Sequence, residues 1–117
     1  ATAWSCSPKE LLLVCDDVNL PLGTIRLRPQ GGAGGHHGLE SCLLALGTDA
    51  VARLRVGVGT PELPRDLETF VLSRFHPTEL PLIRQAVAQA AEASDTWTRE
   101  GIEVAMNRYN TTGTPAT

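Results

Sequence analysis

Two adjacent acids and two adjacent histidines are the side chains of this 117-residue chain best suited to chemistry. Asp16 and Asp17 directly follow the apolar run LLLVC, and His36 and His37 follow the glycine-rich run GGAGG. A carboxylate near an imidazole orients the ring and stabilises its charged form, which suits general acid–base catalysis. Because ligands bind at the carboxyl ends of strands in open α/β sheets, we expect the functional site within residues 11–39.

Each pair also has a simpler interpretation. Neighbouring side chains on a strand point to opposite sides, so at most one of the two acids is expected to face a cleft, and Asp17 is the more typical solvated or capping acid. His36 is the more typical structural histidine, whereas His37 suits a hydrogen bond to a phosphate or ribose at a helix start. A metal site is disfavoured, because adjacent histidines diverge and no Asp or Cys lies at ligand spacing.

The glycine-rich run, residues 31–35, matches neither of the common phosphate-binding motifs. It lacks the lysine of a P-loop, and His37 stands where a dinucleotide fingerprint needs its third glycine. Such a run is typical of backbone that adopts positive φ or approaches a ligand closely, with a flexible connection as the alternative.

The arginines gather around this run although the net charge is −3. Between residues 20 and 60 there are four arginines against two acids, and from residue 61 onward eight acids against five arginines. Arg26 and Arg28, like Arg53 and Arg55, are spaced to share one face of a strand. These pairs either contact phosphates or cover a solvent-exposed face of the sheet.

The elements expected to position these residues alternate between strands and helices. Residues 11–15 are predicted to form a central strand buried on both faces, followed by a turn at 18–23. Residues 24–28 and 53–58 are expected to form strands with one polar side, and in the second strand Leu54, Val56 and Val58 lie on the side opposite Arg53 and Arg55. A helix is predicted at 38–46, ending at Gly47, with the apolar face Leu39, Cys42, Leu43 and Leu46.

The second half is expected to be mostly helical. A turn or short helix is predicted at 66–72, and a long helix from an N-cap at Thr78 to about residue 100. Gly101 is expected to separate it from a last helix, 102–109, and residues 111–117 form a frayed tail. The long helix has a predicted core stripe of Ile83, Val87, Ala90, Ser94 and Trp97.

Length and composition predict one domain over residues 1–117. No apolar run reaches the roughly 18–20 residues that a membrane span needs. The three cysteines share no C-x-x-C spacing, which argues against a disulfide framework or a zinc ribbon and favours a cytoplasmic, reducing setting.

Five segments, in register from residue 11 to residue 110, resemble the bacterial peptidyl-tRNA hydrolases: VCDDVNLPLG, GGAGGHHGLES, RLRVGVGTPE, FVLSRF and EGIEVAMNRYN. The resemblance implies a three-layer α/β fold with a mixed, mostly parallel sheet flanked by helices, as in phosphorylase- and hydrolase-like proteins. It implies hydrolysis of the ester between a nascent peptide and the 3′ ribose of its tRNA. It further implies a monomer that acts on peptidyl-tRNA without a cofactor, a metal or a membrane.

The resemblance also implies roles for individual residues. Asp16 matches the acid that orients and stabilises the catalytic histidine of the family. His37 matches the residue that contacts the tRNA 3′ end and substrate, where the family usually has Asn. Arg28 and Arg55 match the basic residues that clamp the tRNA backbone.

The family segments that carry the catalytic histidine do not occur in these 117 residues. We therefore expect the chain to be an incomplete, C-terminal part of the family domain that is inactive alone. The alternative is a non-catalytic RNA-binding homologue of the same fold, similar to organelle splicing factors.

Overall fold

The computed structural model describes residues 7–59 and 77–110. A 3₁₀ turn, η1 (Pro8–Glu10), precedes strands β1 (Leu12–Pro21) and β2 (Ile25–Arg28). Helix α1 (His37–Leu46) leads to strand β3 (Ala52–Gly59). A second 3₁₀ turn, η2 (Pro77–Glu79), opens helix α3 (Leu80–Glu100), which is followed by helix α4 (Ile102–Tyr109).

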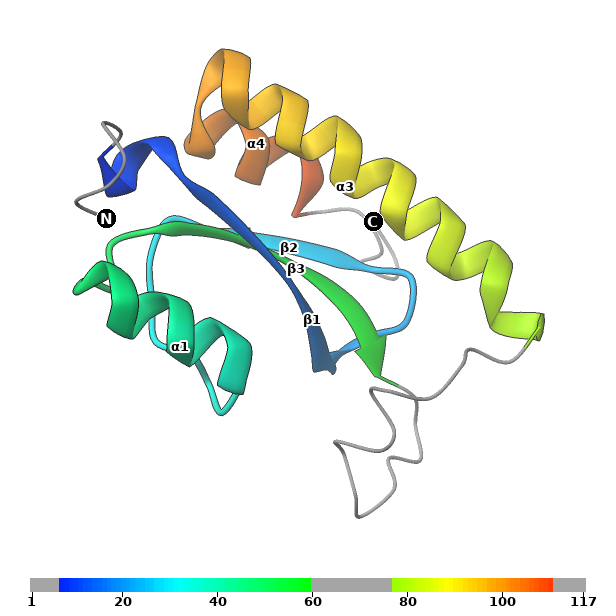
Figure 1. Ribbon diagram of the computed structural model, residues 1–117. Coiled ribbons are helices and arrows are strands. Elements are labelled where there is room, and N and C mark those ends of the chain that lie inside the picture. Colours follow the sequence, from blue (N-terminus) through cyan, green and yellow to red (C-terminus); the bar gives the residue numbers. More distant parts are fainter. Residues whose placement is uncertain (1–6, 60–76, 111–117) are drawn as a thin grey trace.

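The described strands form one mixed sheet in the order β1-β3-β2. β1 pairs with β3 in parallel, and β2 pairs with β3 antiparallel. Figure 1 shows this sheet between α1 on one face and the α3–α4 pair on the other. The predicted α/β fold with a mixed sheet flanked by helices is confirmed.

Side-chain alternation along the strands builds a different core on each face. On the α3–α4 side, the buried residues are Ile25, Leu27, Leu54, Ala86, Ala90, Ala93 and Ala105. On the α1 side they are Leu39, Leu43 and Val51, with Leu13 and Cys15 packed against them. The predicted division of β3 is confirmed for Leu54 and Val56, which join the first core, and for Arg53 and Arg55, which contact the loop on the α1 side. Val58 belongs to neither core.

Strand β1 differs from its prediction in three ways. It continues through Asp16 and Asp17 to Pro21, so the two acids lie inside the strand and residues 18–21 are not a turn. It is not buried on both faces, since Val14 is 58% exposed. Within the described strands the middle position belongs to β3 and not to β1.

Two glycines of β3 explain the extension of β1. A Cβ atom at Gly57 would collide with the carbonyl oxygens of Pro21 and Leu20, and one at Gly59 would collide with that of Val18. The bare backbone lets β1 follow β3 this closely after a shift in register between Asp17 and Pro21. Apolar periodicity carries no signal for such a contact.

The helices follow their predicted ranges, but their buried faces differ in detail. α1 ends at Gly47, whose φ of 73° is the left-handed conformation expected of a C-terminal glycine. Cys42 is exposed and does not belong to the apolar face of α1. α4 confirms the predicted last helix.

The start and the stripe of α3 also differ from the prediction. The N-cap is Glu79 and not Thr78, which lies within η2. The buried positions are Ala86, Ala90, Ala93 and Thr96, while Val87 is 56% exposed. Alanines let the helix axis approach the sheet closely, and a stripe chosen for bulky residues misses them. The predicted segment 66–72 and the predicted tail 111–117 lie outside the described residues.

Candidate functional site

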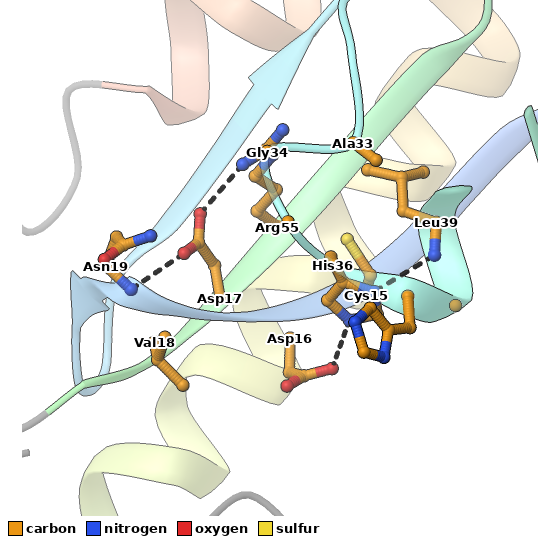
Figure 2. A pocket seen from close by; sticks show the side chains of 13 residues that line it. Cys15, Asp16, Asp17, Val18, Asn19, Ala33, Gly34, His36, Leu39 and Arg55 are labelled. Atoms are coloured by element: carbon orange, nitrogen blue, oxygen red, sulfur yellow. Dashed lines mark hydrogen bonds and ion pairs between the residues drawn. The ribbon is translucent and has the colours of Figure 1, made fainter. Parts of the chain in front are cut away.

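A pocket of about 630 Å³ opens where β1, the glycine-rich loop, the start of α1 and β3 meet. Figure 2 shows its side chains converging from these four elements. β1 contributes residues 15–19, the loop and helix contribute residues 33–39, and β3 contributes Arg55. The pocket therefore lies in the region that the paired acids and histidines predicted.

The glycine-rich loop approaches α1 through backbone that favours glycine. Gly34 and Gly35 have φ of 59° and 85°, and Gly31 has φ of 145°. The predicted positive φ angles are confirmed, and the amide of His36 closes the last turn by donating to the carbonyl of Ala33 at 3.1 Å.

His36 is the N-cap of α1 and uses both ring nitrogens. Its Nδ1 accepts a hydrogen bond from the amide of Leu39 at 3.0 Å, so the proton resides on Nε2. Nε2 donates to Oδ1 of Asp16 at 2.8 Å. Since neither nitrogen is left to take a proton from water, His36 has the structural role that its sequence position favoured.

The two acids of β1 reach different partners, and both line the pocket. Asp17 forms an ion pair with Nη1 of Arg55 at 3.1 Å and accepts a hydrogen bond from the amide of Asn19 at 2.8 Å. Alternation does send the two side chains in different directions, as Figure 2 shows. The prediction that at most one acid faces the cleft is nevertheless wrong. The pocket extends from Arg55 to His36, so both acids line it although their side chains diverge.

Burial governs the chemistry of Cys15, which lies in the pocket wall beside these acids. Removal from solvent raises the pKa of the Cys15 thiol, and the positive charge of Arg55 opposes this only in part. A raised pKa keeps the thiol protonated and poorly nucleophilic. Among the described residues, no group of three or more His, Cys, Asp or Glu side chains is placed to hold a metal ion.

The pocket gathers most of the predicted site residues. Asp16, His37 and Arg55 line it, and His37 is the exposed first residue of α1. Arg28 does not line it and lies exposed at the end of β2, with Nη1 donating to the carbonyl of Leu27 at 3.3 Å. Sequence reasoning missed Asp17 as the partner of Arg55, although an acid–acid pair facing an R-x-R strand was the available signal.

The four central arginines lie on one face of the sheet. The antiparallel register sets Arg26 opposite Arg55 and Arg28 opposite Arg53, and directly opposed residues share a face. Arg53 is fully buried, so these side chains do not form a simple solvent-exposed face. The Nε atoms of Arg26 and Arg55 are buried and find no hydrogen-bond partner within the described structure.

Fold and pocket together define a three-layer α/β protein whose site beside a glycine-rich loop combines two aspartates, two histidines and one arginine. A family model described as peptidyl-tRNA hydrolase matches residues 1–116, and the chain belongs to this family. In the described helices, no segment is long and apolar enough to cross a membrane.

Relatives and solved structures agree with this assignment. The peptidyl-tRNA hydrolase of Chlorobaculum tepidum is 45% identical over 92% of this chain and 57% of its own length. That of Roseiflexus is 46% identical over 86% of this chain and 46% of its own length. The crystal structure of the Acinetobacter baumannii peptidyl-tRNA hydrolase superposes with a TM-score of 0.76 at 29% identity, covering 87% of this chain and 52% of that one. The chain thus spans about half the length of the relatives it matches.

Proposed function

We propose that this protein takes part in hydrolysing the ester between the peptide and the 3′ ribose of peptidyl-tRNA. Membership of the family supports the proposed reaction. One observation supports the pocket as the position of the site. The pocket joins a carboxylate–imidazole pair, an exposed histidine at a helix start and a tethered arginine in one cavity. An ester linked to a polyanion needs these two kinds of group, polar groups at the reacting carbonyl and cations at the phosphates.

Asp16 is proposed to orient and stabilise a histidine base. Oδ1 of Asp16 already accepts a hydrogen bond from His36, while the Asp16 side chain remains 35% exposed. A second imidazole could donate its N–H to Oδ2 of Asp16. By such a bond a carboxylate fixes the tautomer of a histidine base. Backbone amides of the glycine-rich loop are proposed as donors to the oxyanion that forms when water attacks the ester.

His37 is proposed to hold the tRNA 3′ end and the substrate, and Arg28 and Arg55 to hold phosphates. His37 is exposed at the first position of α1, with nitrogens that each donate or accept one hydrogen bond. Arg55 is held by Asp17, so its guanidinium is already oriented before a phosphate arrives. Arg28 lies exposed on the same face of the sheet, where it would extend the basic surface beyond the pocket.

We also propose that residues 1–117 belong to one domain and that the protein acts as a monomer in the cytoplasm, without metal or cofactor. A general base and preorganised donors suffice for attack of water on an activated ester, so the chemistry does not demand a Lewis acid.

The test is cleavage of N-acetylated aminoacyl-tRNA by the purified protein, with tRNA binding measured in the same samples. Cleavage supports the proposal, and its loss in His37→Ala and Arg55→Met, but not in the exposed-helix control Arg84→Met, supports the assigned site. Binding without cleavage would fit either a hydrolase domain that is inactive in these 117 residues alone or the non-catalytic RNA-binding homologue. Absence of both would contradict the proposal.

A further inference from the structure

Arg53 is a charged side chain of the sheet that solvent does not reach. It lies in β3 with 0% exposure. Its three nitrogens donate to three different backbone carbonyls: Nε to Val51 at 3.1 Å, Nη1 to Gly32 at 3.0 Å and Nη2 to Asp49 at 3.2 Å. The divergent fork of a guanidinium makes this possible, whereas the ammonium of lysine presents its donors from one point.

These carbonyls join two separate segments. Asp49 and Val51 precede β3, and Gly32 belongs to the glycine-rich loop. The amide of Gly31 donates to the same Asp49 carbonyl at 3.1 Å, so the loop is attached at two consecutive residues. Nη2 of Arg55 also lies 3.4 Å from the Gly32 carbonyl, which therefore receives two guanidinium groups.

The attachment point lies directly before the pocket wall. The residues that follow Gly32, positions 33–38, all line the pocket. Glycine backbone has little conformational preference of its own, so contacts from outside must hold this stretch in place. Arg53 provides such contacts from the rigid middle strand of the described sheet.

Stability alone does not require a charge at a fully buried position. Burial lowers the pKa of Arg53, and the nearby charge of Arg55 lowers it further, so the site opposes the charge that it contains. Buried charges are frequently neutral or unfavourable for stability when compared with well-packed apolar residues. The divergent carbonyl contacts give the charge a geometric role that an apolar residue could not take.

We propose that Arg53 is a positioning residue that fixes the glycine-rich loop against β3 and thereby sets the place of the pocket-lining residues 33–38. Its contribution to turnover rests on the proposed function, but its effect on the loop does not. The two can be tested separately.

The experiment compares Arg53→Lys and Arg53→Met with the matched variants Arg84→Lys and Arg84→Met, which make the same changes on exposed helix surface. Amide exchange is read at Gly31, His36 and Leu39, whose N–H groups donate within the loop region, and at Gly101, which donates to Trp97 far from it. We expect roughly tenfold faster exchange or more at the three loop amides in both Arg53 variants. Gly101 should change less than threefold, and the Arg84 variants should change neither region.

A second readout is the ¹⁵N spectrum of the His36 imidazole. The native ring should show the single Nε2–H tautomer that its contacts with Leu39 and Asp16 require. Arg53→Lys should average the two tautomers as the loop moves, whereas a loss of core stability alone would leave the folded population with native ring signals.

Equal acceleration at Gly101 and the loop would overturn the proposal, as would a native His36 spectrum in both Arg53 variants. Failure of both variants to fold would also overturn it, because Arg53 would then serve the core. In the hydrolysis assay, the Arg53 variants should lose roughly tenfold or more in kcat, since small displacements of positioned groups carry large kinetic costs. If the native protein neither binds nor hydrolyses N-acetylated aminoacyl-tRNA, the proposed function fails while the exchange and ¹⁵N results still decide the role of Arg53.

Discussion

The two faces of the sheet are built from the same strands, but among the described residues only one of them combines apolar packing with buried charged groups. On the α3–α4 face, Ile25, Leu27 and Leu54 meet a stripe of alanines, and the contact is apolar. On the α1 face, Leu39, Leu43 and Val51 form a smaller apolar cluster. Beside that cluster, Arg53 and Arg55 of β3 contact backbone carbonyls, one carboxylate and the glycine-rich loop. One residue step along a strand separates the two environments.

The comparison indicates that the α3–α4 face mainly provides stability and that the α1 face also positions the atoms of the pocket. Apolar burial is non-directional and tolerates small shifts, so it suits a face whose task is stability. Charged hydrogen bonds are directional, and they fix atoms in place at a cost in solvation. Substitutions on the α3–α4 face should therefore change stability most, and those on the α1 face should change the geometry of the pocket most.

The largest expected effect is on the apolar face, in Leu54→Ala. Leu54 has no exposed surface and lies in the middle strand of the described sheet, so truncation leaves a cavity beneath α3 and α4. We expect a loss of about 2–5 kcal/mol in the free energy of unfolding, measured by chemical denaturation. Val87→Ala, on the exposed side of α3, is the control and should stay within about 0.5 kcal/mol. Equal losses in the two variants would contradict the placement of the core.

The next effect is at the junction that both faces share, in Gly57→Ala. An added Cβ would press against backbone carbonyls of β1, which cannot rotate away as a side chain would. We expect a loss of about 3 kcal/mol together with weakened tRNA binding, because β1 carries both pocket acids. Gly32→Ala is the matched control for unfolding, since its Cβ would meet no atom within 4 Å. If Gly57→Ala unfolds no more readily than this control, β1 does not need the close approach.

Sequence patterns predict the layers of the fold because burial leaves a periodic trace. Strand β3 and helix α1 both showed their buried faces through alternation or helical spacing, and Gly47 marked a helix end through its conformational freedom. The extension of β1 past Asp17 left no such trace, because it depends on glycines of another strand. Val87 and Cys42 were misplaced because hydrophobicity alone does not tell which side of a helix meets the sheet.

The site was predictable as a region but not as a set of contacts. Residue types and their positions brought Asp16, His37 and Arg55 to one place. The contacts Asp16–His36 and Asp17–Arg55 depend on how β1, the loop and β3 pack. The paired residues are 20 and 38 positions apart in the sequence, so local patterns do not predict them. The burial of Arg53 was hidden for a further reason, since an R-x-R strand is equally typical of a solvated surface.

A polar exception within the apolar side gives the third prediction. The side chain of Asn110, at the end of α4, accepts from the amide of Leu27 at 2.6 Å and donates to its carbonyl at 2.9 Å. These two bonds continue the ladder of β2 with a side chain in place of a strand. Asn110→Ala should lose about 2 kcal/mol in the free energy of unfolding, because the Leu27 amide loses its partner and the Leu27 carbonyl keeps only the donor from Arg28.

Two further variants make the test of Asn110 specific. Asn110→Asp keeps the acceptor for the Leu27 amide but sets a second carboxylate oxygen against the Leu27 carbonyl, so it should be clearly less stable than wild type. Asn107→Ala, exposed on the same helix, should be near wild type. An Asn110→Asp variant as stable as wild type would show that the bond to the Leu27 carbonyl contributes nothing.

The smallest change in stability, and the sharpest contrast within the pocket, is expected from the adjacent histidines. His36→Ala removes the N-cap of α1 and the partner of Asp16, and should cost about 1 kcal/mol in the free energy of unfolding. His37→Ala removes an exposed side chain and should stay within about 0.5 kcal/mol, while weakening the binding of N-acetylated aminoacyl-tRNA. Denaturation and tRNA titration of the two variants measure both quantities side by side. A reversed pattern, with His37→Ala unfolding more easily and His36→Ala binding tRNA more weakly at full folding, would exchange the two roles. His36 would then be the residue that contacts the substrate. Its hydrogen bonds with Leu39 and Asp16 argue against this, because they occupy both ring nitrogens.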